Sequence, residues 1–300
     1  MAPNNNNNPF RKLQDKHVLI IGGSSGIGLA VAEGSLAAGA NVTISSSRQA
    51  KVDAAVASLA ASYPDRSVRG IVKDLSLSNS SSSMSGDPDT DTDTETEIEI
   101  KLDSLFRQAI TPSSSSSSSS SSQNKNKNNE NENPINHVVY TAADPLSLGD
   151  LASVTADAIH KAAHMRMVVP ILVAKVAARY LAPSSRESSL TLTTGSVAER
   201  PAKGWSVVSF FGGGLAALTR ALAVDLAPLR VNAVRAGVVD TGLWGDMDGK
   251  REGFLVAMAE KTLTGRVGQV EDVAEAYVWL MKDGNATGTV AGTDGGSLLV

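Results

Sequence analysis

One segment near the amino terminus constrains the fold more than any other, because it joins an apolar strand to a glycine-rich turn and a helix. The run His17–Ile21 is followed by Gly22, Gly26 and Gly28, and an alanine-rich stretch then continues to residue 38. Glycine permits positive φ and lets backbone amides approach an anion without a Cβ in the way. The start of the following helix adds partial positive charge. The pattern predicts a diphosphate-binding turn in an α/β fold; the alternative is a tight turn that binds nothing.

The rest of the chain alternates short runs rich in Val, Ile and Leu with helical patterns. We expect strands at 17–21, 41–45, 68–72, 137–141, 189–193, 230–234 and 288–290. We expect helices at 28–38, 51–62, 98–110, 156–180, 213–227 and 270–281. Apolar strands of this kind are typical of a sheet covered by helices on both faces. The sequence therefore predicts a doubly wound α/β Rossmann fold with a mainly parallel, seven-stranded sheet.

Two polar stretches of low complexity interrupt this pattern. Residues 78–96 are mostly Ser, Asp and Thr, and residues 111–133 hold a serine run followed by Asn, Lys and Glu. Such stretches bury too little apolar surface to offset the entropy of ordering them. We expect a disordered tail over 1–14 and one domain over 15–300, interrupted by two disordered insertions. For the serine run, a phosphorylated regulatory arm is the alternative to a tolerated loop expansion.

The composition argues against several classes of function. The chain carries 27 Lys and Arg against 31 Asp and Glu, and this net charge of −4 disfavours a nucleic-acid partner. It has no cysteine, which removes disulfides, thiolate nucleophiles and cysteine-based zinc sites. The histidine spacing suggests no metal site. With no apolar leader or membrane span in the sequence, we expect a cytoplasmic protein with a small-molecule substrate and no membrane partner.

Further motifs lie at the ends of the expected strands. They are Asp74-Leu75, Ala142-Ala143, Val231-Asn232-Ala233-Val234, Gly237, Val239, Thr241 and the closing Thr293-Asp294-Gly295-Gly296. Together with the G-x-x-x-G-x-G spacing, they resemble the short-chain dehydrogenase/reductase family. The resemblance covers nearly all of the chain outside the insertions. It departs from the family pattern where Arg235 and Ala236 replace the usual Ser and Pro.

The resemblance implies that a nicotinamide cofactor binds along these strand ends. The implied contacts are Gly22, Ser24, Ser25, Gly26, Ile27, Gly28, Ser47, Arg48, Asp74, Leu75, Ala142, Ala143, Gly237, Val239 and Thr241. Family members that use NAD carry an acidic residue after the second strand, where it binds the ribose 2′-hydroxyl. Ser47 and Arg48 stand there instead, and they suit the 2′-phosphate of NADP(H). The alternative for Arg48 is an exposed surface charge.

The Tyr-x-x-x-Lys pair that the family uses for proton transfer is absent. Aligning the tail of its helix places Val208 at the tyrosine and Gly212 at the lysine. The family's serine position falls at Ser196, and its helix asparagine falls near Arg166. Trp205 closes a Pro-Ala-Lys-Gly-Trp loop. The pattern is similar to a divergent fungal branch, including alkaloid reductase/Diels–Alderases, which lacks Tyr and Lys, keeps an Arg and has a Pro-Asp-Pro-Gly-Trp loop.

We therefore expect Arg166, Trp205 and Ser196 to be the catalytic candidates, with Asp144 as a minor one. A structural ion pair is the alternative for Arg166, and loop packing is the alternative for Trp205. The leading hypothesis is an NADP(H)-dependent oxidoreductase that reduces an iminium or conjugated carbonyl in alkaloid or other secondary metabolism. The alternatives are an isomerase or cyclase and a non-catalytic NADP-binding protein. The apolar stretch 215–226 predicts a homodimer or homotetramer.

Overall fold

One parallel sheet organises the chain. The computed structural model describes residues 8–77, 90–111, 133–181, 185–247 and 249–300. Seven strands pair in the order β3-β2-β1-β4-β5-β6-β7. They are β1 (His17–Ile21), β2 (Asn41–Ser46), β3 (Val68–Val72), β4 (His137–Tyr140), β5 (Ser189–Gly195), β6 (Arg230–Ala236) and β7 (Val290–Thr293). The chain reverses its direction of travel across the sheet between β1 and β4, so the strand ends there open a crevice for a ligand.

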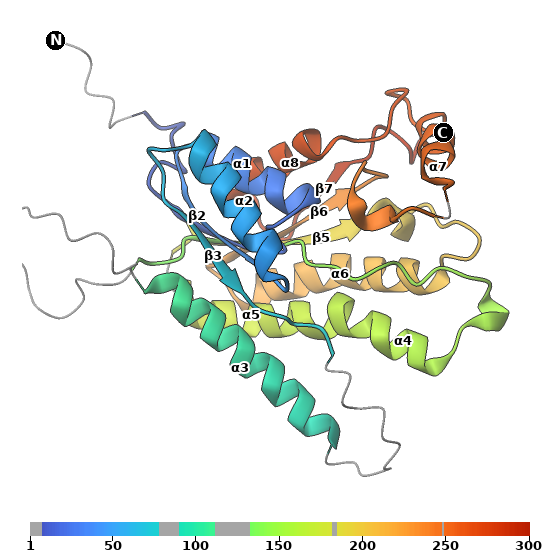
Figure 1. Cartoon of the computed structure of the whole chain (residues 1–300), viewed down its shortest axis with the longest axis horizontal. Coiled ribbons are helices and arrows are strands. Elements are labelled where there is room, and N and C mark those ends of the chain that lie inside the picture. Colours follow the sequence, from blue (N-terminus) through green and yellow to red (C-terminus); the bar gives the residue numbers. More distant parts are fainter. Residues whose placement is uncertain (1–7, 78–89, 112–132, 182–184, 248) are drawn as a thin grey trace, which may run out of the picture.

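Helices cover both faces of this sheet (Figure 1). They are α1 (Gly26–Ala37), α2 (Gln49–Ser62), α3 (Thr90–Ile110), α4 (Ala156–Ala163), the π-helical turn η4 (His164–Val168), α5 (Val169–Tyr180), α6 (Ser206–Asp225), α7 (Arg251–Ala259) and α8 (Val270–Lys282). Short 3₁₀ turns are η3 (Leu151–Ser153), η5 (Ser196–Ala198) and η6 (Gly242–Trp244). One apolar core joins α3, α5 and α6 to the sheet, and a second joins α1, α2 and α8. The doubly wound α/β fold that the sequence predicts is confirmed.

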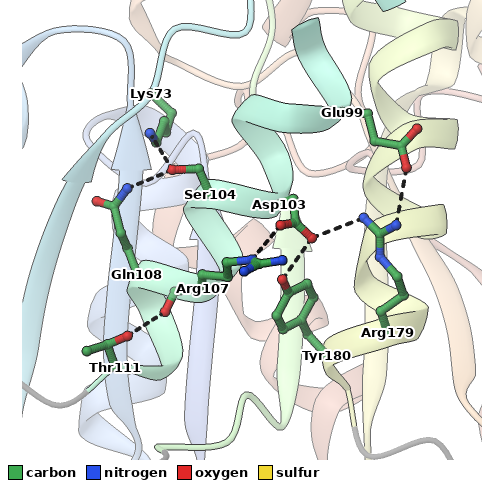
Figure 2. A network of polar contacts seen from close by, with 9 residues as sticks. All are labelled: Lys73, Glu99, Asp103, Ser104, Arg107, Gln108, Thr111, Arg179 and Tyr180. Atoms are coloured by element: carbon green, nitrogen blue, oxygen red, sulfur yellow. Dashed lines mark hydrogen bonds and ion pairs between the residues drawn. The ribbon is translucent and has the colours of Figure 1, made fainter. Parts of the chain in front are cut away.

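Helix α3 is fixed to α5 by apolar and polar contacts. Its buried side chains are Ile98, Leu102, Leu105, Phe106 and Ala109. Beside them, the Asp103 carboxylate accepts hydrogen bonds from Tyr180 at 2.8 Å and from Arg179 at 3.2 Å, and it also pairs with Arg107 (Figure 2). Glu99 pairs with Arg179 and with Lys175. The helix begins at Thr90, so the expected start at residue 98 was wrong, and part of the 78–96 stretch is helical.

Several other boundaries differ from the sequence prediction. Helix α6 begins at Ser206, seven residues earlier than expected, because Val207, Val208 and Phe211 already bury an apolar face. The last strand is Val290–Thr293, and the expected long helix over 156–180 is divided by the π-helical turn. Helix α7 was not predicted. Of the two expected insertions, residues 78–89 and 112–132 lie outside the described residues, as do residues 1–7 of the expected tail. Residues 8–14 of the tail are described, and Leu13 is buried in the second core, so the expected disorder was wrong for this part.

Helix α6 is also the one helix in the described part of the chain that is long and apolar enough to cross a membrane. It packs against β5 and β6, with Leu215, Thr219 and Leu222 buried. This placement explains its composition as that of a core helix.

The amino-terminal edge of the sheet holds buried polar side chains. His17 contacts the Thr43 hydroxyl through Nε2 at 2.8 Å, and His137 contacts the Ser189 hydroxyl through Nδ1 at 2.9 Å. The guanidinium of Arg230 donates to the backbone carbonyls of Arg186, Glu187, Leu280, Met281, Asp283 and Ala286. These contacts satisfy polar groups that would otherwise be costly to bury.

Candidate active site

The turn after β1 has the geometry of a phosphate cradle. Gly22 has φ +99°, and a Cβ there would lie 2.5 Å from the amide nitrogen of Ala142. A Cβ at Gly28 would lie 2.2 Å from the carbonyl oxygen of Gly22. The amides of Gly22 and Gly23 donate to the carbonyl of Ser45, which anchors the turn to β2. Only glycine fits at positions 22 and 28, as an anion-binding turn requires.

The loop after β6 closes against this cradle. Gly26 has φ +55°, and a Cβ there would lie 3.5 Å from the Thr241 methyl group, so residue 241 borders the phosphate turn. Ser24 and Ile27 are half-buried, and Ser25 is exposed immediately before α1. The turn and the start of α1 therefore face Thr241 across a short distance, at the place where a dinucleotide's diphosphate would be held. The residues present fit a dinucleotide.

The positions expected around the adenosine half lie on three neighbouring strand ends. Ser47 and Arg48 are exposed between β2 and α2. Asp74 is exposed after β3, and its Oδ1 accepts hydrogen bonds from the Ser76 hydroxyl at 2.6 Å and amide at 3.0 Å. These bonds hold the pKa of the Asp74 carboxyl below its usual value. Leu75 is buried, while the expected contacts Ala142 and Ala143 begin the loop after β4.

Arg166 is committed to the loop after β4. Its guanidinium forms an ion pair with the Asp144 carboxylate and donates to the carbonyls of Asp144 at 2.7 Å and Pro145 at 3.3 Å. Only 10% of the Arg166 side chain is exposed. The geometry gives Arg166 the role of a loop anchor and brings Asp144 beside the expected cofactor contacts. The neighbouring Tyr140 donates to the Met165 carbonyl, and burial raises its pKa far above the ordinary value, so it is a poor acid.

The positions of the missing proton relay face the end of β5. Val208 is buried on the first turn of α6. A Cβ at Gly212 would lie 3.4 Å from the Thr194 hydroxyl oxygen, and that hydroxyl donates to the Gly212 carbonyl at 2.8 Å. Ser196 follows directly in η5 and is half-buried. Neither Val208 nor Gly212 has a side chain that can donate a proton. Ser196 is therefore the candidate proton donor after the end of β5.

Three aromatic side chains, from the start of α6, from η6 and from α7, form a row of contacts. The ring centroids of Trp205 and Trp244 are 6.2 Å apart, and those of Trp244 and Phe254 are 4.9 Å apart. The Trp244 indole donates to the Val239 carbonyl at 2.7 Å. All three side chains are half-buried. Sequence reasoning found Trp205 but missed Trp244 and Phe254, which no local motif marks.

A second arginine ties the end of the chain to the site. Arg235 pairs with Glu199 at 2.6 Å and with Asp294 at 3.0 Å. The Asp294 backbone lies so close to Gly237 that a Cβ at Gly237 would be 2.8 Å from its Cα. Arg235, which replaces the family's usual serine, therefore holds η5 and the closing Thr293-Asp294-Gly295-Gly296 motif together beside the loop containing Gly237 and Val239.

Comparison with known proteins agrees with this architecture. The model of the SDR-like Rossmann domain matches residues 10–85 and 110–300. The chain belongs to the short-chain dehydrogenase/reductase family. It is 38% identical to the short-chain dehydrogenase/reductase malC of Malbranchea aurantiaca over 288 residues, 96% of each chain. It is 34% identical to the short-chain dehydrogenase/reductase ATR9 of Stachybotrys chlorohalonatus over 287 residues, 96% of this chain and 98% of that one.

Solved structures show the same relationship. The MalC reductase/Diels–Alderase of Malbranchea aurantiaca superposes with a TM-score of 0.79 at 38% identity, covering 98% of this chain and 100% of that one. A short-chain dehydrogenase/reductase of Serratia marcescens superposes with a TM-score of 0.73 at 22% identity, covering 96% and 99% of the two chains, and shows the shared fold. The resemblance to the divergent fungal branch is confirmed at the level of the family and these relatives. The oxidoreductase fold is that of a nicotinamide-dependent enzyme.

Proposed function

We propose that this chain is an NADP(H)-dependent reductase of secondary metabolism that acts on an acceptor already activated towards hydride, such as an iminium ion or a conjugated carbonyl. One contrast carries the proposal. The cradle at Gly22 and Gly28 has room only for glycine, while the relay positions hold Val208 and Gly212. A nicotinamide cofactor supplies a hydride when bound.

The proposed cofactor contacts follow the strand ends. The backbone amides between Ser24 and Gly28 hold the diphosphate, since those of Gly22 and Gly23 already donate to Ser45, and Thr241 closes over it. The exposed guanidinium of Arg48, with Ser47 beside it, pairs with the 2′-phosphate. Asp74, Leu75, Ala142 and Ala143 line the adenine end, and Gly237 and Val239 line the nicotinamide end. No acidic residue follows β2 to repel the 2′-phosphate, because Ser45–Arg48 occupy that stretch.

The chemistry of the acceptor follows from the relay positions. Hydride addition to a ketone creates an alkoxide, which needs a proton or strong stabilisation. Val208 and Gly212 provide neither. Hydride addition to an iminium carbon gives a neutral amine and creates no oxyanion. A conjugated carbonyl gives an enolate, for which we propose the Ser196 hydroxyl as the donor.

The charges and aromatic groups of the rim also suit a cationic acceptor. Arg166 is paired with Asp144, and Arg235 with two carboxylates. Their positive charge is thereby balanced, so neither repels a cation. The faces of Trp205, Trp244 and Phe254 attract a cation through the ring quadrupole.

Cyclisation is a second candidate, favoured by the likeness to a protein described as a reductase/Diels–Alderase. A cycloaddition needs a shaped, largely apolar pocket, and the cluster of Trp205, Trp244 and Phe254 offers one wall of it. Against it, Ala202 stands in the loop position where the similar fungal branch has an aspartate. A non-catalytic NADP-binding protein is the third candidate.

Titration with NADPH, followed by assays of NADPH consumption, separates these candidates. We expect consumption with an N-methyl dihydroisoquinolinium ion or with cyclohexenone, and very little with cyclohexanone. Equal rates on cyclohexanone would contradict the proposal and identify Ser196 as the first proton donor to test. Cyclised product formed without consumption of NADPH would support the second candidate. Tight NADPH binding with no turnover of any acceptor would favour the third.

A further inference from the structure

The π-helical turn η4 contacts two loops at the carboxyl edge of the sheet, one after β3 and one after β4, although β2 and β1 lie between these strands. Its first residue, His164, lies with Nε2 2.7 Å from the carbonyl oxygen of Leu75, after β3. Its third residue, Arg166, donates to the carbonyls of Asp144 and Pro145, after β4. Because a carbonyl oxygen can only accept, the Nε2 of His164 carries the proton.

The direction of the two side chains explains how one turn reaches both loops. Residues two apart on a helical turn lie on roughly opposite sides of it. His164 therefore reaches towards β3 while Arg166 reaches towards the loop after β4. The hydroxyl of Tyr140 on β4 donates to the Met165 carbonyl at 2.8 Å, which fixes the middle of the turn to the sheet. Turns of this type recur at functional sites.

These two loops are the ones that carry Leu75 on one side and Ala142-Ala143 on the other. His164 is only 6% exposed, so its bond to Leu75 is shielded from water. A second contact supports the same loop from α3, since Lys73 donates to the Ser104 hydroxyl at 3.0 Å (Figure 2). The position of Leu75 relative to Ala142 is thus set through the π-helical turn.

We propose that His164 is a positioning residue for the adenine end of the cofactor. It acts through Leu75, and it fixes the width of the adenine site between the loop after β3 and the loop after β4. This inference rests on the proposed NADP(H) site. Without His164, the Asp74-Leu75 loop loses its tie to the turn, and the adenine end of the cofactor must order that loop when it binds.

The test compares two ligands that share the adenine half. NADPH and 2′,5′-ADP are titrated by calorimetry into the natural chain, His164→Ala and His164→Gln, with His160→Ala as the control. His160 is exposed on α4, one turn before His164. We expect His164→Ala to bind both ligands about two- to tenfold more weakly, by a similar factor for each. The glutamine amide can donate to Leu75, so His164→Gln should recover most of the affinity. His160→Ala should match the natural chain.

The other outcomes are equally informative. A lower melting temperature with unchanged affinity for both ligands would show that His164 only stabilises the fold, and would overturn the inference. A loss confined to NADPH would place its effect at the nicotinamide end and overturn it too. If His164→Ala does not fold, His164→Asn, whose side chain is too short to reach Leu75, takes its place. Failure of the natural chain to bind either ligand would refute the cofactor proposal itself, whereas binding that His164 variants do not alter would refute only the positioning role.

Discussion

The two buried histidines at the amino-terminal edge of the sheet predict a marked loss of stability in mild acid. His17 and His137 are each 2% exposed. Burial lowers the pKa of His17 from 6.5 to about 4, although its bond to the Asn133 carbonyl opposes this. Burial, with the nearby charges of Arg230 and Lys16, lowers the pKa of His137 to about 3. Both side chains therefore stay neutral in the folded chain at pH 5.

The sign and size of the effect follow from proton linkage. Below pH 6.5 the unfolded chain takes up a proton on each histidine while the folded chain does not, so the free energy of unfolding falls as the pH falls. Each histidine contributes about 1.4 kcal/mol per pH unit. From pH 6.5 to pH 5 the loss is about 2 kcal/mol for each, or about 4 kcal/mol together, and it continues down to the folded pKa values.

Urea unfolding at pH 7.5, 6.5 and 5.0 measures this loss. His137→Gln removes one of the two groups, so its stability should fall about half as much between pH 7.5 and 5.0. His160→Gln, at an exposed position, should fall as much as the natural chain. Aspartates such as Asp74, whose pKa lies below the ordinary 3.8, remain ionised throughout this range. A free energy of unfolding that stays constant between pH 7.5 and 5.0 would refute the reasoning.

Three further predictions concern the cofactor, the assembly and the core. Arg48→Ala should remove most of a preference for NADPH over NADH, about 1–3 kcal/mol for a charge-assisted contact; equal affinities in the natural chain would contradict the assignment. Phe210 is 69% exposed on α6. We expect the chain to form a homodimer or homotetramer, and Phe210→Glu to dissociate it, as measured by light scattering. A monomeric natural chain would refute this. Arg230→Met should cost at least about 3 kcal/mol in urea unfolding, because several buried carbonyls lose their donor, whereas the exposed Arg220→Met should cost little.

The elements best predicted from the sequence are those with a single dominant local signal. Strands β1 and β3 were predicted with their observed bounds. For β1 the reason is that the apolar run Val18–Ile21 has few other ways to be buried, whereas in β3 only Ile71 is buried. The start of α6 was missed: the helix was predicted from residue 213, within the run of glycines at 212–214, a residue type that disfavours a helix interior. Tertiary packing overrode that weak propensity, since Val207 and Phe211 are buried ahead of the glycines.

The parts of the site that sequence reasoning missed are contacts between distant segments. Arg166 was a candidate because a charge stood among apolar neighbours, yet its pairing with Asp144 depends on how the loop after β4 folds back. Trp244 and Phe254 carry no motif: Trp244 contacts Trp205, and Phe254 on α7 contacts Trp244, only because segments distant in the sequence come together there. Local spacing contains no information about such pairs.

The two halves of the proposed site are constrained in different ways. At Gly22 and Gly28 any side chain would overlap the backbone or Thr141. The turn can therefore keep this shape only with glycine at both positions. At Gly212 the nearest atoms to an added Cβ are 3.4 Å away, so a Cβ there would make only ordinary van der Waals contacts. Since α6 is held to the sheet one or more turns later, by Leu215 and Thr219, the residues at its first turns can change without moving the cradle. Under the proposed function, the absence of relay side chains at Val208 and Gly212 restricts hydride transfer to acceptors already activated towards it.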